Sequence, residues 1–322
     1  MRQVTASIGL LPALLALSAA VPVRAQQPAA PAQQPAPAAQ QPAPAAPPAT
    51  DVFLVSLTDP AAWTAGSVVN ISASPGYDNQ PSFMRDSRSV LFTSNRDGKQ
   101  SDIYRYWIAD RKLTQLTATP ESEYSATIVP SGSGFSVIQV EADNTQRLWQ
   151  FAFAARAGAG LEASLVLPDI KPVGYHAWID KDTVMLFVLG EPATLQRAAP
   201  GSPLAETIAS GVGRSLVSIP GTRAVSFTTR DENGVWWIKR YDADTGEVRA
   251  LVHAVEGAGE PHTAWARDGR LFTAAGTRVF TWKEGAADWT PVGDLAAAPV
   301  TGISRLAVSP DGRWLAFVAE NR

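Results

Sequence analysis

The segment Ser67–Met84 reads SVVNISASPGYDNQPSFM, and the segment Lys112–Val129 reads KLTQLTATPESEYSATIV. The two align without a gap at an offset of 45 residues. Each contains a short run rich in β-branched and apolar residues, a loop marked by proline, and a second such run. Runs of this kind, bounded by turn residues, predict short β-strands. The chain therefore repeats a unit in which two strands are joined by a loop.

An apolar residue that stands just before a turn recurs along the whole chain. We call these residues the anchors, and they are separated by 45, 50, 39, 48 and 43 residues. The anchors are Phe83, Ile128, Trp178, Val217, Trp265 and Val308. A period in the forties with four short strands per unit is typical of propeller blades. The sequence predicts an all-β fold, a six-bladed β-propeller of four-stranded antiparallel blades.

The first complete unit predicts how each blade is built. Its four expected strands are Ser82–Met84, Ser89–Thr93, Asp102–Trp107 and Leu113–Thr117. Polar and glycine residues separate these runs, as in the turn Asn95-Arg96-Asp97-Gly98, where the backbone must change direction. Helical periodicity of useful length is absent from the chain.

The two ends of this region complement each other. The last run, Leu306–Phe317, supplies only the two inner strands of a blade. Asp51–Val55 is similar to the third-strand segment Asp102–Tyr106, and Val68–Ser72 provides a fourth strand. We expect the last blade to be closed by N- and C-terminal strands, because this pairing leaves no open sheet edge in the ring. The same complementarity predicts that the chain is complete.

Several segments resemble a known repeat. They are Ser309–Phe317, which reads SPDGRWLAF, Phe92–Gly98 followed by Asp102–Tyr104, and Leu113–Thr117, which reads LTQLT. These segments resemble the WD40-like (PD40) repeat of the TolB-type propellers of bacterial periplasms. The resemblance covers the chain from about Thr50 to its end, and it is weakest in the third unit. It implies a six-bladed ring that acts as a non-enzymatic scaffold and binds a protein over one face of its central funnel.

The N-terminal region predicts export. Arg2 precedes an apolar run from Ile8 to Ala20, and Val23 and Ala25 stand where signal peptidase requires small residues. Residues 1–25 are therefore predicted to be a signal peptide, and residues 26–50, almost entirely Gln, Pro and Ala, a disordered linker. The propeller is expected to span residues 51–322. The predicted location is the periplasm or the extracellular space.

Composition excludes several classes of site and partner. The 322 residues include 27 Lys and Arg against 30 Asp and Glu, a formal charge of −3, so no basic surface for nucleic acid is expected. The absence of cysteine excludes disulfides, zinc–thiolate sites and thiol nucleophiles. The apolar run near the N-terminus is too short for a stable membrane anchor. The sequence predicts a monomer with no cofactor and no bound metal, and an envelope protein or peptide as its partner.

Sequence motifs bear on whether the protein is an enzyme. The chain has no Gly-x-Ser-x-Gly elbow and no His-Glu-x-x-His pair. Its three histidines, His176, His253 and His262, lack the spacing of metal ligands, although separate blades can bring distant residues together. A metal-dependent hydrolase or lactonase with His176, His262 and Glu260 in the funnel stays open as an alternative. So does a carbohydrate-binding propeller, for which exposed Trp at the funnel mouth would be diagnostic.

The candidate binding surface is the face formed by two sets of loops. These are the loops that precede the first strand of each blade and the loops that follow its second strand, because loops on a rigid ring commonly carry function. The candidate binding residues are Asn95, Arg96, Asp97, Glu123, Tyr124, Tyr175, His176, Arg230, Asp231, Glu260 and His262. The sequence thus predicts a scaffold that binds a protein or peptide at the rim of its central funnel.

Overall fold

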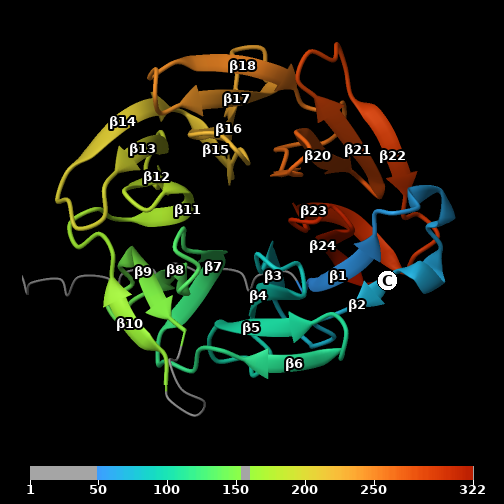
Figure 1. Ribbon diagram of the computed structural model, residues 1–322, viewed down its shortest axis with the longest axis horizontal. Helices are drawn as coiled ribbons and strands as arrows, with labels where there is room; N and C mark the ends of the chain where they lie inside the picture. Colours follow the sequence, from blue (N-terminus) through green and yellow to red (C-terminus); the bar gives the residue numbers. More distant parts are fainter. Residues whose placement is uncertain (1–48, 154–159, 322) are drawn as a thin grey trace, which may run out of the picture. The chain divides into compact units, whose positions relative to one another are not determined.

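The computed structural model describes residues 49–153 and 160–321. The predicted signal peptide and residues 26–48 of the predicted linker lie outside the described residues. Within the described ranges the chain forms six four-stranded sheets arranged as the blades of a ring (Figure 1). In that same part of the chain no helix has the length and apolar character needed to span a membrane. The predicted six-bladed fold is confirmed.

Each of the first five blades follows the chain from its inner to its outer strand. Blade 1 consists of β3 (Asp78–Phe83), β4 (Ser89–Ser94), β5 (Asp102–Trp107) and β6 (Lys112–Gln115). Blade 2 consists of β7 (Ser122–Ile128), β8 (Gly134–Val140), β9 (Gln146–Ala152) and β10 (Glu162–Leu165). Blade 3 consists of β11 (Val173–Asp180), β12 (Thr183–Val188), β13 (Thr194–Ala198) and β14 (Ala205–Ser210). The expected strands of the first unit match β3 to β6 to within a few residues.

Blades 4 and 5 repeat the same order, and all pairings within a blade are antiparallel. Blade 4 consists of β15 (Val212–Ser218), β16 (Ala224–Arg230), β17 (Trp236–Asp242) and β18 (Val248–His253). Blade 5 consists of β19 (Thr263–Trp265), β20 (Arg270–Ala275), β21 (Arg278–Lys283) and β22 (Thr290–Asp294). In the described part of the chain the helical elements are two short 3₁₀ turns, η1 (Pro60–Ala62) and η2 (Ala65–Ser67).

Blade 6 is built from both ends of the described chain. Its strands are β1 (Asp51–Ser56), β2 (Val69–Asn70), β23 (Val300–Val308) and β24 (Trp314–Asn321), in the order β2-β1-β24-β23. β1 pairs antiparallel with β24 over six residues, from Asp51 opposite Ala319 to Ser56 opposite Trp314. The predicted closure by N- and C-terminal strands is therefore confirmed. Backbone hydrogen bonds complete the ring at this blade.

Alternation along each strand explains how the blades pack. In β1, Val52 and Leu54 contact the apolar cluster shared with blade 1, whereas Phe53 and Val55 contact the cluster shared with blade 5. Successive side chains of a strand point to opposite faces, so one strand serves two interfaces. One buried cluster of this kind lies between each pair of neighbouring blades. The ring therefore has several interblade cores in place of one central core.

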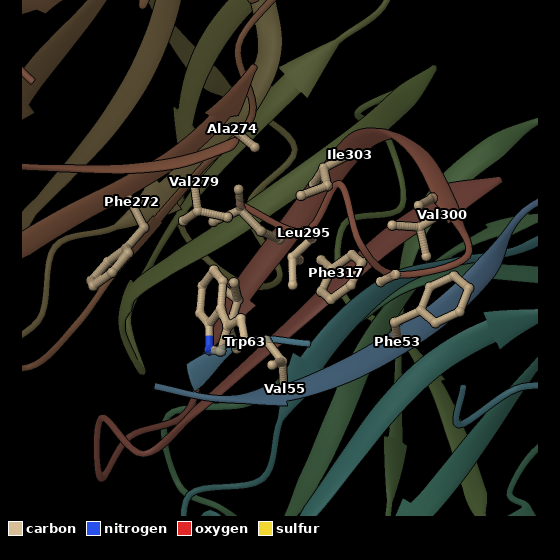
Figure 2. Close-up of a cluster of buried hydrophobic side chains, with 14 of the residues drawn as sticks. Phe53, Val55, Trp63, Phe272, Ala274, Val279, Leu295, Val300, Ile303 and Phe317 are labelled. Carbon is tan, nitrogen blue, oxygen red and sulfur yellow. The ribbon is translucent and has the colours of Figure 1, made fainter. Parts of the chain in front are cut away.

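The core between blades 5 and 6 shows how the closure is stabilised (Figure 2). The rings of Phe53 and Phe317 stack with their centroids 5.4 Å apart. Trp63 lies buried in the same cluster and donates from Nε1 to the carbonyl oxygen of Ser56 at 2.7 Å. The segment between β1 and β2 thus covers this core as well as connecting two strands.

Candidate functional site

The inner strands of the six blades face the centre of the ring (Figure 1). Residues on these strands or just before them line a cavity there. Its volume is about 140 Å³. Each blade contributes the side chain that stands three residues before its anchor. We call this set the channel ring: Gln80, Ser125, Tyr175, Arg214, His262 and Arg305. The repeat that builds the blades therefore also places one residue of each blade at the axis.

Irregular pairing between strands determines the backbone conformation at the channel-ring positions. In blades 1, 2, 3, 4 and 6, the register between the inner strand and its neighbour shifts beside or across the channel-ring residue. In β3 the shift lies between Asn79 and Ser82, and Gln80 has a φ of 56°. In β7 the shift lies between Tyr124 and Thr127, and Ser125 has a φ of 58°. A β-bulge re-aims the side chain that it carries, so these shifts position channel residues.

Arg305 and Tyr175 join opposite sides of the ring. Arg305 lies on β23 of blade 6, and Tyr175 lies on β11 of blade 3. Arg305 Nη2 donates to the Tyr175 hydroxyl at 2.7 Å, and the guanidinium lies 4.9 Å from the centroid of the Tyr175 ring. This contact combines a charge-assisted hydrogen bond with a cation–π interaction. It holds the Arg305 side chain in the channel.

Two of the predicted histidines face this cavity and are held neutral. Burial lowers the pKa of His176 to about 3, and its Nε2 lies 2.6 Å from the hydroxyl of Ser136. Burial, with smaller contributions from Arg305 and Arg214, lowers the pKa of His262 well below its ordinary value. Both imidazoles are therefore uncharged at neutral pH. They offer polar atoms to the cavity without adding to its charge.

A second, wider cavity opens beside the channel at the end of the ring where the inner strands begin. It has a volume of about 500 Å³ and shares Gln80, Tyr175 and Arg214 with the channel cavity. We call it the mouth cavity, and its other lining residues are Tyr77, Tyr124, Ile138, Val140, Gln146, Gly174, Phe187, Leu189, Gly190 and Ala193. Apolar and aromatic side chains dominate this list. The mouth is therefore a partly apolar recess next to a polar channel.

Three tyrosines stand close to the two arginines at this junction. Burial raises the pKa of Tyr77 to about 12, and Arg305, Tyr175, Tyr124 and Arg214 all lie near enough to affect it. The rings of Tyr77 and Tyr124 meet edge to face with centroids 6.5 Å apart. The Tyr77 hydroxyl therefore stays protonated at neutral pH, and tyrosine hydroxyls can both donate and accept hydrogen bonds.

The eleven candidate residues fall into separate groups. Tyr124, Tyr175, His176 and His262 line one or both cavities. Glu260 lies beside them, because its Oε1 accepts a hydrogen bond from the backbone N–H of Arg214 in the neighbouring blade. A Cβ at Gly213 would lie 2.9 Å from that oxygen, so glycine there allows the close approach.

Glu123 is buried and does not line either cavity. Thr119 Oγ1 donates to its Oε1, whereas Oε2 has no hydrogen-bond partner among the described residues. Burial raises the pKa of Glu123 to about 7. The carboxyl is therefore part of an interior polar pair and not of an exposed rim.

The loops that follow the second strands lie farther from the axis. Arg96 packs over the ring of Tyr104 at 4.5 Å and donates to the carbonyl oxygen of Ser72 at 3.1 Å, and Asp97 accepts from the backbone of its own turn. Asn95 donates its backbone N–H to the Tyr77 carbonyl at 2.9 Å. Neither cavity is lined by these residues.

Arg230 and Asp231 occupy the corresponding loop of blade 4. Arg230 Nε donates to the carbonyl oxygen of Gly234 at 2.9 Å. Asp231 accepts from the backbone N–H of Val235 at 2.8 Å and from Nε1 of Trp237 at 3.1 Å. Their hydrogen bonds stabilise a local hairpin at some distance from the channel.

Sequence reasoning did not select Tyr77, Arg214 or Arg305. The signal for the two arginines was present, since both stand three residues before an anchor, at the position that Tyr175 and His262 occupy in their own blades. Tyr77 carried no comparable signal. Its place at the mouth depends on the conformation of the chain just before β3.

Two findings bear on the alternatives. Across residues 49–153 and 160–321, no group of three or more His, Cys, Asp and Glu side chains is placed to hold a metal ion. None of the residues that line the channel cavity or the mouth cavity is a tryptophan. The aromatic side chains at the mouth are tyrosines and one phenylalanine.

Comparison with known proteins places the fold. No family model and no curated protein sequence matches the chain. Among solved structures, a TolB protein from Agrobacterium tumefaciens is 15% identical, with a TM-score of 0.62 over 84% of this chain and 98% of that one. TolB from Acinetobacter baumannii is 12% identical, with a TM-score of 0.54 over 84% of this chain and 64% of that one. The fold is that of the TolB-type propellers.

The same TolB-type ring is similar to an enzyme. An oligogalacturonate lyase in complex with manganese is 12% identical, with a TM-score of 0.52 over 79% of this chain and 80% of the lyase. A fold that carries both TolB proteins and a lyase does not select a function by itself. The residues that line the channel and the mouth are the features of this chain that bear on its function.

Proposed function

We propose that this protein is an exported, non-enzymatic scaffold that binds an extended segment of another protein, or a peptide, at the mouth cavity. The observation that carries the proposal is the mouth itself. It is a preformed recess of about 500 Å³ in a rigid ring, within the range of ordinary ligand sites. We further propose that the protein acts as a monomer, and that it acts in the periplasm or outside the cell, the location that its predicted signal peptide indicates.

The chemistry of the mouth supports a peptide ligand. Ile138, Val140, Phe187 and Leu189 offer apolar contacts on the side of blades 2 and 3. Leu189 is 40% exposed, although large aliphatic side chains are usually buried. Tyrosines beside it combine a broad apolar surface with a polar tip, a combination enriched where proteins bind one another. Apolar side chains of a bound segment would fill this recess.

A matched pair of substitutions tests the proposal. Peptides selected on the purified protein from a displayed random library should bind it, and Leu189→Glu should weaken that binding by about tenfold or more. The reason is that a leucine side chain, which the bound peptide would cover, is replaced by a charge. Leu204→Glu makes the same change at a residue that is 77% exposed and outside the mouth.

Dissociation constants measured by fluorescence anisotropy decide the result. The proposal expects a large loss for Leu189→Glu and little change for Leu204→Glu. Equal losses of affinity for both variants, or an affinity that Leu189→Glu does not change, would show that the peptides bind elsewhere on the ring.

A further inference from the structure

Two arginines, Arg214 and Arg305, belong to the channel ring. Elsewhere in the described ranges, Arg147 pairs with Glu141 and Arg240 pairs with Asp242. Within those same ranges, neither Arg214 nor Arg305 forms an ion pair. The single side-chain hydrogen bond found there for Arg305 goes to the hydroxyl of Tyr175 and not to a carboxylate. Two guanidinium groups therefore face one cavity, and neither forms an ion pair with a carboxylate of the described residues.

The cavity walls do not supply the missing negative charge. No Asp or Glu lines either the channel cavity or the mouth cavity. Glu260 lies next to Arg214 but lines neither cavity, and its Oε1 accepts a hydrogen bond from the backbone N–H of Arg214. His176 and His262 are neutral at pH 7, so the charge of the cavity comes from the two guanidinium groups. This concentration of positive charge stands out in a protein whose formal net charge is −3.

Donor geometry favours a planar anion. A guanidinium group has five N–H donors arranged in a fork that matches the two oxygens of a carboxylate. Tyr175 holds the Arg305 side chain in place through its hydroxyl and its ring, which reduces the entropy lost when a ligand binds. The cavity of about 140 Å³ is well above the roughly 10–15 Å³ that one water occupies. It has room for a carboxylate group and a short stem.

We propose that Arg214 and Arg305 form a carboxylate-binding seat in the channel, which receives an acidic group of the ligand bound at the mouth. The inference rests on the proposed function, because it takes the ligand to enter through the mouth. The mouth would contact apolar side chains, and the channel beneath it would bind the carboxylate. Peptides that carry an acidic residue next to apolar residues are then the preferred partners.

Synthetic probes separate the sources of the carboxylate. The full-length protein is titrated with four ligands in parallel: a blocked hexaglutamate, a Gly-Ser hexapeptide with a free C-terminus, citrate and inorganic phosphate. Blocked hexaglutamine, the amidated Gly-Ser peptide and blocked hexalysine are the uncharged and oppositely charged controls. A carboxylate probe should bind, and added salt should weaken it, because screening reduces interactions between charges.

Substitutions locate the binding. Arg214→Gln and Arg305→Gln should each weaken the carboxylate probe about tenfold, or about 1.4 kcal/mol. Arg267→Gln removes the same charge from an exposed turn outside both cavities and should leave binding unchanged. Arg214 is itself exposed, so its replacement does not disturb a core, and a thermal melt checks the fold of each variant.

Each result of these titrations either supports or overturns the proposed carboxylate seat. Binding of a carboxylate probe that is weakened by Arg214→Gln and by Arg305→Gln supports the seat. The probe that binds in this way shows whether the carboxylate comes from an acidic side chain, a chain terminus or a small molecule. The inference is overturned if no carboxylate probe binds better than its control, if phosphate alone binds, or if Arg267→Gln has the same effect. If the seat is overturned but display-selected peptides still lose affinity on Leu189→Glu, the proposed function is still supported and only the carboxylate seat is refuted.

Discussion

Deletion of Asp51–Ser72 is expected to abolish the cooperative unfolding of the propeller. The deletion removes β1 and β2, and among the buried side chains that it removes are four almost fully buried ones of β1, Val52, Phe53, Leu54 and Val55. Burial of such a side chain contributes about 1.5–3 kcal/mol, so four contribute about 6–12 kcal/mol. A whole domain is stable by only about 5–15 kcal/mol. The shortened chain therefore loses most or all of its net stability.

Loss of β1 also exposes the backbone of β24. Six residues of β24 would lose their paired neighbour, and an unpaired strand edge recruits other chains. The measurements are the thermal melt followed by circular dichroism and the particle size from gel filtration. The expected result is a broad, early transition together with aggregates. A shortened chain that remains monomeric and melts as late and as sharply as the parent would refute the closure of the ring at blade 6.

Glu123→Gln is expected to stabilise the protein above pH 7 and to have little effect near pH 4.5. Burial raises the pKa of Glu123 from its ordinary value of 4.5 to about 7, so the folded state holds this proton more tightly than the unfolded state. The free energy of unfolding then falls as the pH rises from about 4.5 to about 7 and is level above that range. Glutamine has no proton to lose, and the expected gain at pH 8 is about 1–3 kcal/mol.

Urea unfolding at pH 5 and at pH 8 tests this prediction. Glu162→Gln, at an exposed position on β10, provides the control and should change the stability little at either pH. Thr119 can still donate to the amide oxygen of the variant, so the local contact is retained. A variant whose advantage is the same at both pH values would show that Glu123 titrates normally.

The architecture could be predicted from the sequence because the repeat follows from how a blade is built. Each blade must bury both faces of its strands, which requires the same alternation in every unit, and turn residues fall where the chain reverses. This is why the anchors located six blades and why Asp51–Val55 could be assigned to the last sheet. The third unit, where Trp178 precedes an atypical turn, still forms β11 and β12.

The candidate site was harder to predict than the fold. Loops at the same end of the propeller lie at different distances from the ring axis, and the sequence pattern does not show which loops are close to it. Arg96 and Asp231 lie in such loops, but their side chains serve contacts within and between blades. Glu123 and Tyr124 are neighbours on β7, yet one is buried between loops and the other lines the mouth, because consecutive strand residues point to opposite sides. The position three residues before each anchor marks the residues that reach the channel, whereas the loops that follow the second strands carry no comparable mark.

A crystal structure of the protein with a display-selected peptide would show where a ligand lies on the ring. We expect the peptide in the mouth against Tyr124, Tyr175 and Leu189, with an acidic group within hydrogen-bonding distance of Arg214 or Arg305. A peptide bound along an outer strand such as β10 or β14, with both cavities unchanged, would contradict this expectation.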